Sequence, residues 1–289
     1  MSLRLLLVHA HPDDESIATG VCLAHHVAAG DEVHVLTCTL GEQGEVIPPE
    51  LAHLDADHDD TLGPYRREEL RRAMSAIGAQ HRVLGEGAGT LSRYRDSGMV
   101  GTPSQDDPRA FARADVAEAA ALVRAVVEEV DPDLVITYDP QGGYRHPDHV
   151  QTHRVVCAAV AALPTAARPV VLAVLTPRTW ADEDRAHLAQ HGPARASWTL
   201  PTGEHPPQVV PDELVAFEVV DPQAVAGQVA ALREHRTQVS VEGDQYALSN
   251  DIAARLSGRE GYAELDVETG ALVPPSSPAR RPLAEAVRR

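Results

Sequence analysis

The sequence lacks any run of about 18 consecutive apolar residues, the length that a membrane-spanning helix needs. Its start, Met1 to Arg4, leads directly into a short apolar run without the pattern of a signal peptide. We therefore expect a cytoplasmic protein that does not act within a membrane.

The sequence contains few cysteines, and fewer basic than acidic residues. Cys22, Cys38 and Cys157 are an odd number without the spacing of a metal site, so we expect reduced thiols in the core. The 289 residues carry 25 Lys and Arg against 43 Asp and Glu, a formal net charge of −18. This balance disfavours nucleic acid and anionic membranes as partners and favours a neutral or cationic small molecule.

Apolar runs alternate with helical periodicity along most of the chain. Buried strands are predicted at 3–8, 32–39, 82–84, 134–138, 170–175 and 214–220. Helices are predicted at 17–29, 65–77, 112–130, 147–163, 181–190 and 222–236. This alternation predicts an α/β fold with a Rossmann-like, mostly parallel sheet flanked by helices.

The polar stretches 41–63 and 85–108 are too long for simple connections, and we predict that they form active-site loops. No linker divides the rest, so we expect one α/β domain over residues 1–273. Residues 274–289 are rich in Ser, Pro and Arg, and a disordered tail is expected there.

Two short motifs resemble each other, His11-Pro12-Asp13-Asp14 and His146-Pro147-Asp148-His149. Each follows a predicted strand and opens a predicted helix, with Pro at about the first helical position. The carboxyl ends of parallel strands lie at one edge of a sheet, where ligands bind. We therefore expect the two motifs to meet there.

The residue types in the motifs favour a catalytic metal site. His11 and Asp14 are three residues apart and can face the same side of a helical turn, and His149 would complete a set of two histidines and one carboxylate. Three protein ligands with an open position are typical of catalytic sites. The ligand types suit one Zn²⁺ per subunit, and Fe²⁺ is the alternative.

The neighbouring side chains supply the groups that hydrolysis needs. Asp13 is the predicted general base for a metal-activated water. His146, as an imidazolium, is expected to donate to a leaving amine or to the developing oxyanion, with Asp148 orienting its ring. Tyr144 follows a Gly-Gly pair and can donate its hydroxyl to a carbonyl oxygen. The set predicts metal-assisted hydrolysis of an amide or ester.

Each of these residues also has a simpler explanation. Acidic residues at a helix N-terminus complement the helix dipole without a metal, and a single histidine at a strand end is most often structural. The alternative is a sugar- or nucleotide-binding module whose motifs only cap helices, although no Gly-x-Gly-x-x-Gly follows a strand. The joint occurrence of both motifs favours the metal site. His235 has no recognisable role.

The runs His9–Glu15 and His146–His149 together resemble the signature of the PIG-L/LmbE-like superfamily of metal-dependent N-acetylglucosaminyl deacetylases. The resemblance implies that His11, Asp14 and His149 hold the metal and that Asp13 is the base. It also implies that His146 and Tyr144 assist the tetrahedral intermediate and the leaving group.

Within the superfamily, the runs 37–47, 93–99 and 137–153 resemble the branch that acts in mycothiol biosynthesis. This implies a small sugar-inositol substrate, N-acetylglucosaminyl-inositol, from which acetate is removed, and contacts of Arg66 and Asp96 with its hydroxyls. The related mycothiol S-conjugate amidases typically have Lys shortly after the first motif, where this chain reads Ser16 to Thr19. A deacetylase of another N-acetylglucosamine glycoside is a further alternative.

Overall fold

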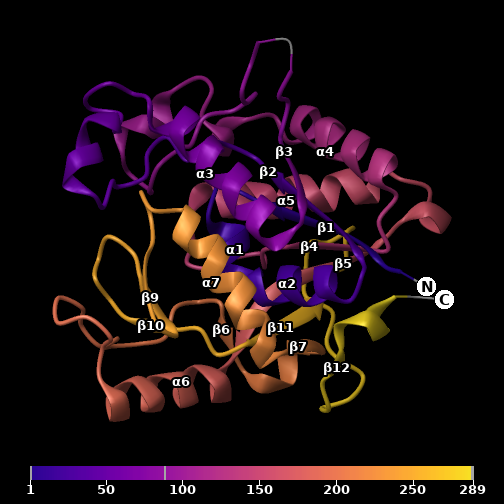
Figure 1. The fold of residues 1–289 in the computed structure, drawn as a ribbon. Coiled ribbons are helices and arrows are strands. Elements are labelled where there is room, and N and C mark those ends of the chain that lie inside the picture. Colours follow the sequence, from indigo (N-terminus) through magenta and orange to yellow (C-terminus); the bar gives the residue numbers. More distant parts are fainter. Residues whose placement is uncertain (1, 88, 288–289) are drawn as a thin grey trace.

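A nine-stranded sheet forms the centre of the computed structural model, which describes residues 2–87 and 89–287 (Figure 1). One part of the sheet is parallel, in the order β3-β2-β1-β4-β5. These strands are β1 Arg4–His9, β2 Glu32–Thr37, β3 Gln80–Val83, β4 Leu134–Thr137 and β5 Val170–Pro177. The expected mostly parallel sheet is confirmed.

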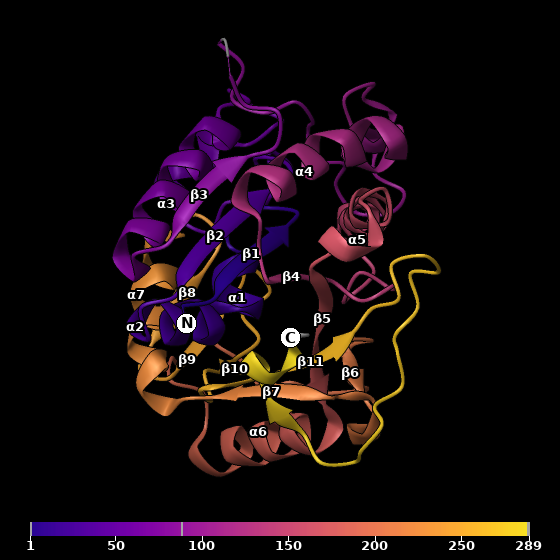
Figure 2. The same ribbon diagram turned by 90° about the vertical axis from the view of Figure 1, so that its right-hand side faces the viewer.

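Helices cover both faces of this parallel part (Figure 2). On one face lie α2 Gly20–Ala28, α3 Leu62–Ile77 and α7 Val225–Glu234, and on the other α4 Val116–Val130 and α5 Pro147–Ala161. Because side chains alternate along a strand, β1 sends Leu5 and Leu7 into the first layer and Leu6 and Val8 into the second. A strand covered on both faces has a run of consecutive apolar residues, here Leu5 to Val8, and such a run is recognisable in the sequence.

The sheet continues at its other edge with strands of mixed direction. β11 Arg259–Glu264 lies antiparallel between β5 and β7 Phe217–Val220, while β6 Val209–Val210 pairs with the end of β5. β11 was not predicted from the sequence. Its Arg-Glu-Gly-Tyr-Ala-Glu sequence has no apolar run, and its inward-facing Glu260 is a buried carboxyl.

The C-terminal segment corrects an expectation. β12 Arg281–Pro282 pairs with β7, and the following 3₁₀ turn, Leu283–Ala286, buries Leu283 and Ala286 in the core beside β1 and α2. The predicted disordered tail is therefore wrong over 281–286, because two apolar side chains in a polar stretch are enough to anchor it. Residues 288–289 of that prediction lie outside the described residues.

The first motif does not start its helix as predicted. α1 Asp14–Ala18 is a short helix, and Thr19, with non-helical backbone angles, separates it from α2. Pro12 lies before α1, not at its first position, because Asp13 adopts φ 119° and separates the two. In the second motif Pro147 is the first residue of α5, as expected.

Other boundaries differ from the predictions by a few residues. α3 begins inside the predicted 41–63 loop, and the predicted start of α4 is a 3₁₀ turn. A small antiparallel sheet that was not predicted contains β8 Ser240–Glu242, β9 Gln245–Ala247 and β10 Ala254–Arg255. The remaining helix is α6 Arg178–His191. The other 3₁₀ turns are η1 Pro49–Leu54, η2 Pro103–Asp106, η3 Phe111–Arg113, η4 Thr165–Ala167, η5 Asp212–Leu214 and η6 Pro222–Ala224.

Candidate metal and catalytic site

The two motifs meet at the carboxyl ends of β1 and β4, which are neighbours in the sheet. β1 is the strand at which the chain order reverses, from β3-β2-β1 on one side to β4-β5 on the other. In open α/β sheets the crevice at such a reversal is the usual ligand site. The fold therefore delivers both motifs to this crevice.

Asp14 bridges two histidines. Its Oδ2 lies 3.3 Å from His11 Nδ1 and 3.3 Å from His149 Nε2. Ligand atoms bound about 2.1 Å from a tetrahedral ion are about 3.4 Å apart, so this spacing fits a metal. The Nε2 of the buried His149 lies beside the Asp14 carboxylate without forming a hydrogen bond among the described residues. A buried nitrogen without a hydrogen bond costs free energy, and a cation bound to Nε2 and Asp14 would remove that cost.

The charges around His11 also suit a cation. Burial alone would lower the pKa of His11, but the carboxylates of Asp96, Asp14 and Asp148 raise it well above its ordinary value. Burial would likewise raise the pKa of Asp14, yet His149 and His11 hold it well below the usual range. Several carboxylates thus face one imidazole in a buried site, and a divalent ion would offset this excess of negative charge.

His146 belongs to the same cluster but presents a different group. One ring nitrogen from each of His11, His146 and His149 lies within 4.8 Å of the others. The Nδ1 of His146 accepts a hydrogen bond from the backbone N–H of Asp148 at 3.2 Å. Burial and the two other imidazoles lower the pKa of His146 to about 3, so its ring is neutral and its proton is on Nε2. His146 is therefore a donor into the site and a poor metal ligand.

The structure corrects the partner predicted for Asp148. Its Oδ2 contacts His11 Nε2 at 3.2 Å, whereas only the backbone of Asp148 contacts His146. The carboxylate also accepts hydrogen bonds from the N–H and hydroxyl of Ser97. A carboxylate on one ring nitrogen of a histidine fixes the tautomer and leaves the other nitrogen bare for a metal. Asp148 thus orients His11.

Asp13 pairs with Arg66. Its Oδ2 lies 3.2 Å from Arg66 Nη2, and the same guanidinium donates to the carbonyl oxygens of Pro12 and Gly41. Burial raises the pKa of Asp13 to about 7, against the opposing charge of Arg66. A carboxyl with a pKa near neutrality is suited to accept a proton and to return it.

A model of the PIG-L family, described as GlcNAc-PI de-N-acetylase, matches residues 6–160, which include both motifs and the strands that carry them. The chain belongs to the PIG-L family. The resemblance stated from the sequence is confirmed.

Curated relatives of this PIG-L chain match it over nearly their full lengths. A protein of Geodermatophilus obscurus is 48% identical over 93% of this chain and 94% of its own. One of Streptomyces avermitilis is 46% identical over 92% and 93%. Both are named 1D-myo-inositol 2-acetamido-2-deoxy-alpha-D-glucopyranoside deacetylase.

A solved structure, the A40926 pseudoaglycone deacetylase, shares the fold with this PIG-L chain. It superposes with a TM-score of 0.52 at 21% identity, over 82% of this chain and 83% of its own. Over residues 2–87 and 89–287, the PIG-L chain forms no helix of the length and apolarity needed to cross a bilayer.

The two predicted substrate contacts lie close to this PIG-L site but already have protein partners. Arg66 is only 3% exposed and is held by the contacts with Asp13, Pro12 and Gly41. Asp96 lies 3.5 Å from His11 Nε2 and accepts hydrogen bonds from the backbone N–H groups of Gln43 and Gly98. Their contacts with substrate hydroxyls stay predictions.

Tyr144 lies at the open side of the site, 47% exposed. Its ring packs edge-on against His149 and His146, with centroids 4.9 and 5.9 Å away. The backbone around it runs through positive φ at Gly142, Gly143 and Arg145, a path that the glycines favour. The Gly-Gly pair thus allows the loop to bring Tyr144 to the site.

Sequence reasoning missed three residues that support this PIG-L site. Tyr138 stacks on His149 at 4.1 Å, and its hydroxyl accepts the N–H of Ala10. Glu15 is fully buried, accepts the N–H of Asp13, and pairs with His235 at 2.8 Å. Glu15 directly follows the first motif, so its position could have indicated a role in the site. His235 is 220 positions from Glu15, and nothing in the sequence around it indicated a role.

Proposed function

We propose that the protein hydrolyses the acetamide bond of N-acetylglucosaminyl-inositol, 1-D-myo-inositol 2-acetamido-2-deoxy-α-D-glucopyranoside, in mycothiol biosynthesis. The names of the curated relatives support this substrate. The observation that carries the chemistry is the bridging position of Asp14 between His11 and His149, with Asp13 beside it. We also propose that the protein is cytoplasmic, as expected from the sequence.

The divalent ion in this proposal is Zn²⁺, one per subunit, with Fe²⁺ as the alternative. His11, Asp14 and His149 would hold it through Nδ1, Oδ2 and Nε2. Such an ion lowers the pKa of a bound water and polarises the substrate carbonyl. Asp148 would keep the Nε2 proton of His11 in place, so that Nδ1 stays a ligand.

Asp13 is the general base of the proposed reaction. Its carboxylate accepts a proton from the attacking water as the new C–O bond forms, and it delivers that proton to the amine nitrogen as the C–N bond breaks. Arg66 keeps Asp13 in place through the contact at Oδ2 and the bond to the Pro12 carbonyl. The products are acetate and a free amine.

His146 and Tyr144 stabilise the negative charge that develops on the carbonyl oxygen. His146 does so as a neutral donor through Nε2–H, which replaces the imidazolium expected from the sequence. Tyr144 offers its hydroxyl from the open side, and a phenol is protonated at neutral pH and can donate. Donors fixed before the reaction stabilise the transition state more than donors that must reorient.

The test combines metal analysis with turnover. Protein purified without oxygen should contain about one zinc or iron per chain and should release acetate from N-acetylglucosaminyl-inositol. Because the sequence contains no lysine, an amine-reactive dye reports the new amine against little background.

Faster turnover of a mycothiol S-conjugate would favour the amidase alternative. Faster turnover of another N-acetylglucosamine glycoside would favour the alternative of a deacetylase that acts on that glycoside. Binding of a sugar without acetate release would support the binding-module alternative and refute the proposal.

A further inference from the structure

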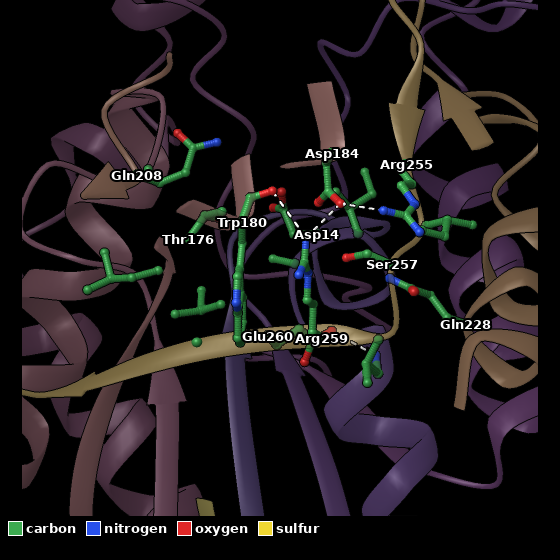
Figure 3. Close-up of a pocket in the computed structure, with 18 of the residues that line it drawn as sticks. Asp14, Thr176, Trp180, Asp184, Gln208, Gln228, Arg255, Ser257, Arg259 and Glu260 are labelled. Carbon is green, nitrogen blue, oxygen red and sulfur yellow. Dashed lines mark hydrogen bonds and ion pairs between the residues drawn. The ribbon is translucent and has the colours of Figure 1, made fainter. Parts of the chain in front are cut away.

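A pocket of about 250 Å³ adjoins the metal site. It shares Asp14, Tyr144 and His149 with the site and extends toward α6, β10 and β11, with neither Arg66 nor Asp96 in its lining. Figure 3 shows its far side chains, which come from segments that the sequence motifs do not include. An acetyl group would leave most of this space empty.

Polar side chains that both donate and accept hydrogen bonds line the pocket. They are the hydroxyls of Thr176 and Ser257 and the amides of Gln208 and Gln228. A ligand with hydroxyl groups can pair with all of them, because a hydroxyl also both donates and accepts.

The two guanidinium groups that line the pocket already have carboxylate partners. Asp184 pairs with Arg255 at 3.1 Å and with Arg259 at 2.9 Å (Figure 3). Trp180 is held between two guanidinium groups, those of Arg259 and Arg280 at 5.1 and 4.6 Å from its ring. A phosphate or carboxylate would have to displace these carboxylate partners. The pocket therefore suits an uncharged ligand.

Apolar atoms complete the lining. Ile17 and Val21 come from α1 and α2, and Leu175 comes from β5, next to the hydroxyl of Thr176. A polyol ring presents C–H groups as well as hydroxyls. Its C–H groups can pack against the apolar side chains while its hydroxyls form hydrogen bonds with the polar ones. The volume, the hydroxyl and amide groups of the lining and the paired guanidinium groups thus describe an uncharged ligand rich in hydroxyls.

We propose that this pocket binds the inositol ring of the substrate, with Thr176, Gln208 and Arg255 contacting its hydroxyls. The inference rests on the proposed function, and it adds where the inositol ring binds and which inositol-containing substrates are accepted. A substrate whose inositol carries a phosphate should be a poor one, because the pocket offers no free positive charge.

The test is a ratio of two specificity constants, kcat/KM for N-acetylglucosaminyl-inositol divided by kcat/KM for N-acetylglucosamine. Gln208→Met and Thr176→Val keep side-chain size and remove one polar contact each. Each variant should lower the ratio about tenfold, mainly through the KM of the inositol substrate. Gln223→Met, at an exposed position outside the pocket, is the matched control.

The two proposals fail in different ways. Acetate release from the wild type with an unchanged ratio in both variants would refute the inositol pocket and leave the proposed function standing. Equal turnover of a phosphorylated inositol substrate would also refute the pocket assignment. No acetate from N-acetylglucosaminyl-inositol would overturn the proposed function, and the inference with it.

Discussion

Replacing Asp13 by asparagine tests the proposed base with little change of shape. In the structure its carboxylate faces Arg66, whereas the ligand atoms proposed for the metal belong to His11, Asp14 and His149. A positioned base contributes roughly 10²- to 10⁴-fold to a rate, so kcat should fall by about that factor, equivalent to roughly 3–5 kcal/mol of activation free energy.

The assay measures acetate release and bound metal on the same preparation. Asp13→Asn should keep about one metal per chain, and its residual activity should lose the acidic limb of the wild-type pH profile. Asp57→Asn, an exposed aspartate in the 41–63 stretch, is the control and should behave as wild type. A variant that retains more than about a tenth of the wild-type kcat would refute the role of Asp13 as base.

Four further changes test other parts of the structure. His11→Ala should lose both metal and turnover, as elemental analysis and acetate release can show. His235→Gln leaves Glu15 buried without its partner, so urea unfolding should report a loss of roughly 3–5 kcal/mol. Leu283→Ala should cost about 2–5 kcal/mol by the same measurement, whereas a disordered tail would give no change. Burial raises the pKa of Glu260 from 4.5 to about 7, so its protonated form stabilises the fold, fully so below pH 4.5. As the pH rises to 7, the free energy of unfolding should fall by roughly 3 kcal/mol. Glu260→Gln should reduce this pH dependence, which unfolding curves at pH 5 and 8 can measure.

The parts of the fold that the sequence predicted are those in which one strand or helix carries its own pattern. β1 and β4 are buried on both faces, so Leu5 to Val8 and Leu134 to Ile136 are all apolar and each run is visible without tertiary information. β11 is buried as well, but it contains charged residues whose burial depends on partners elsewhere: Glu260 accepts the N–H groups of Val21 and Cys22. A buried charge with distant partners looks exposed when the sequence is read locally.

The candidate site shows the same division. The convergence of both motifs was predictable, because the carboxyl ends of parallel strands share one edge of the sheet. The assignment of Asp148 to His146 was wrong because closeness in sequence was taken for side-chain contact. As the N-cap of α5, His146 uses its Nδ1 on the backbone of Asp148, and this leaves the carboxylate free to reach His11, 137 positions away.

The backbone at Asp13 explains how two adjacent aspartates take different roles. A φ of 119° is rare for a residue with a side chain, and it requires support from the surrounding structure. Glu15 provides part of it by accepting the N–H of Asp13, and Arg66 provides more by donating to the carbonyl of Pro12. With this conformation held, Asp14 faces the histidines while Asp13 faces Arg66. The division between ligand and base therefore depends on two side chains outside the four-residue motif, and on the buried His235 that fixes one of them.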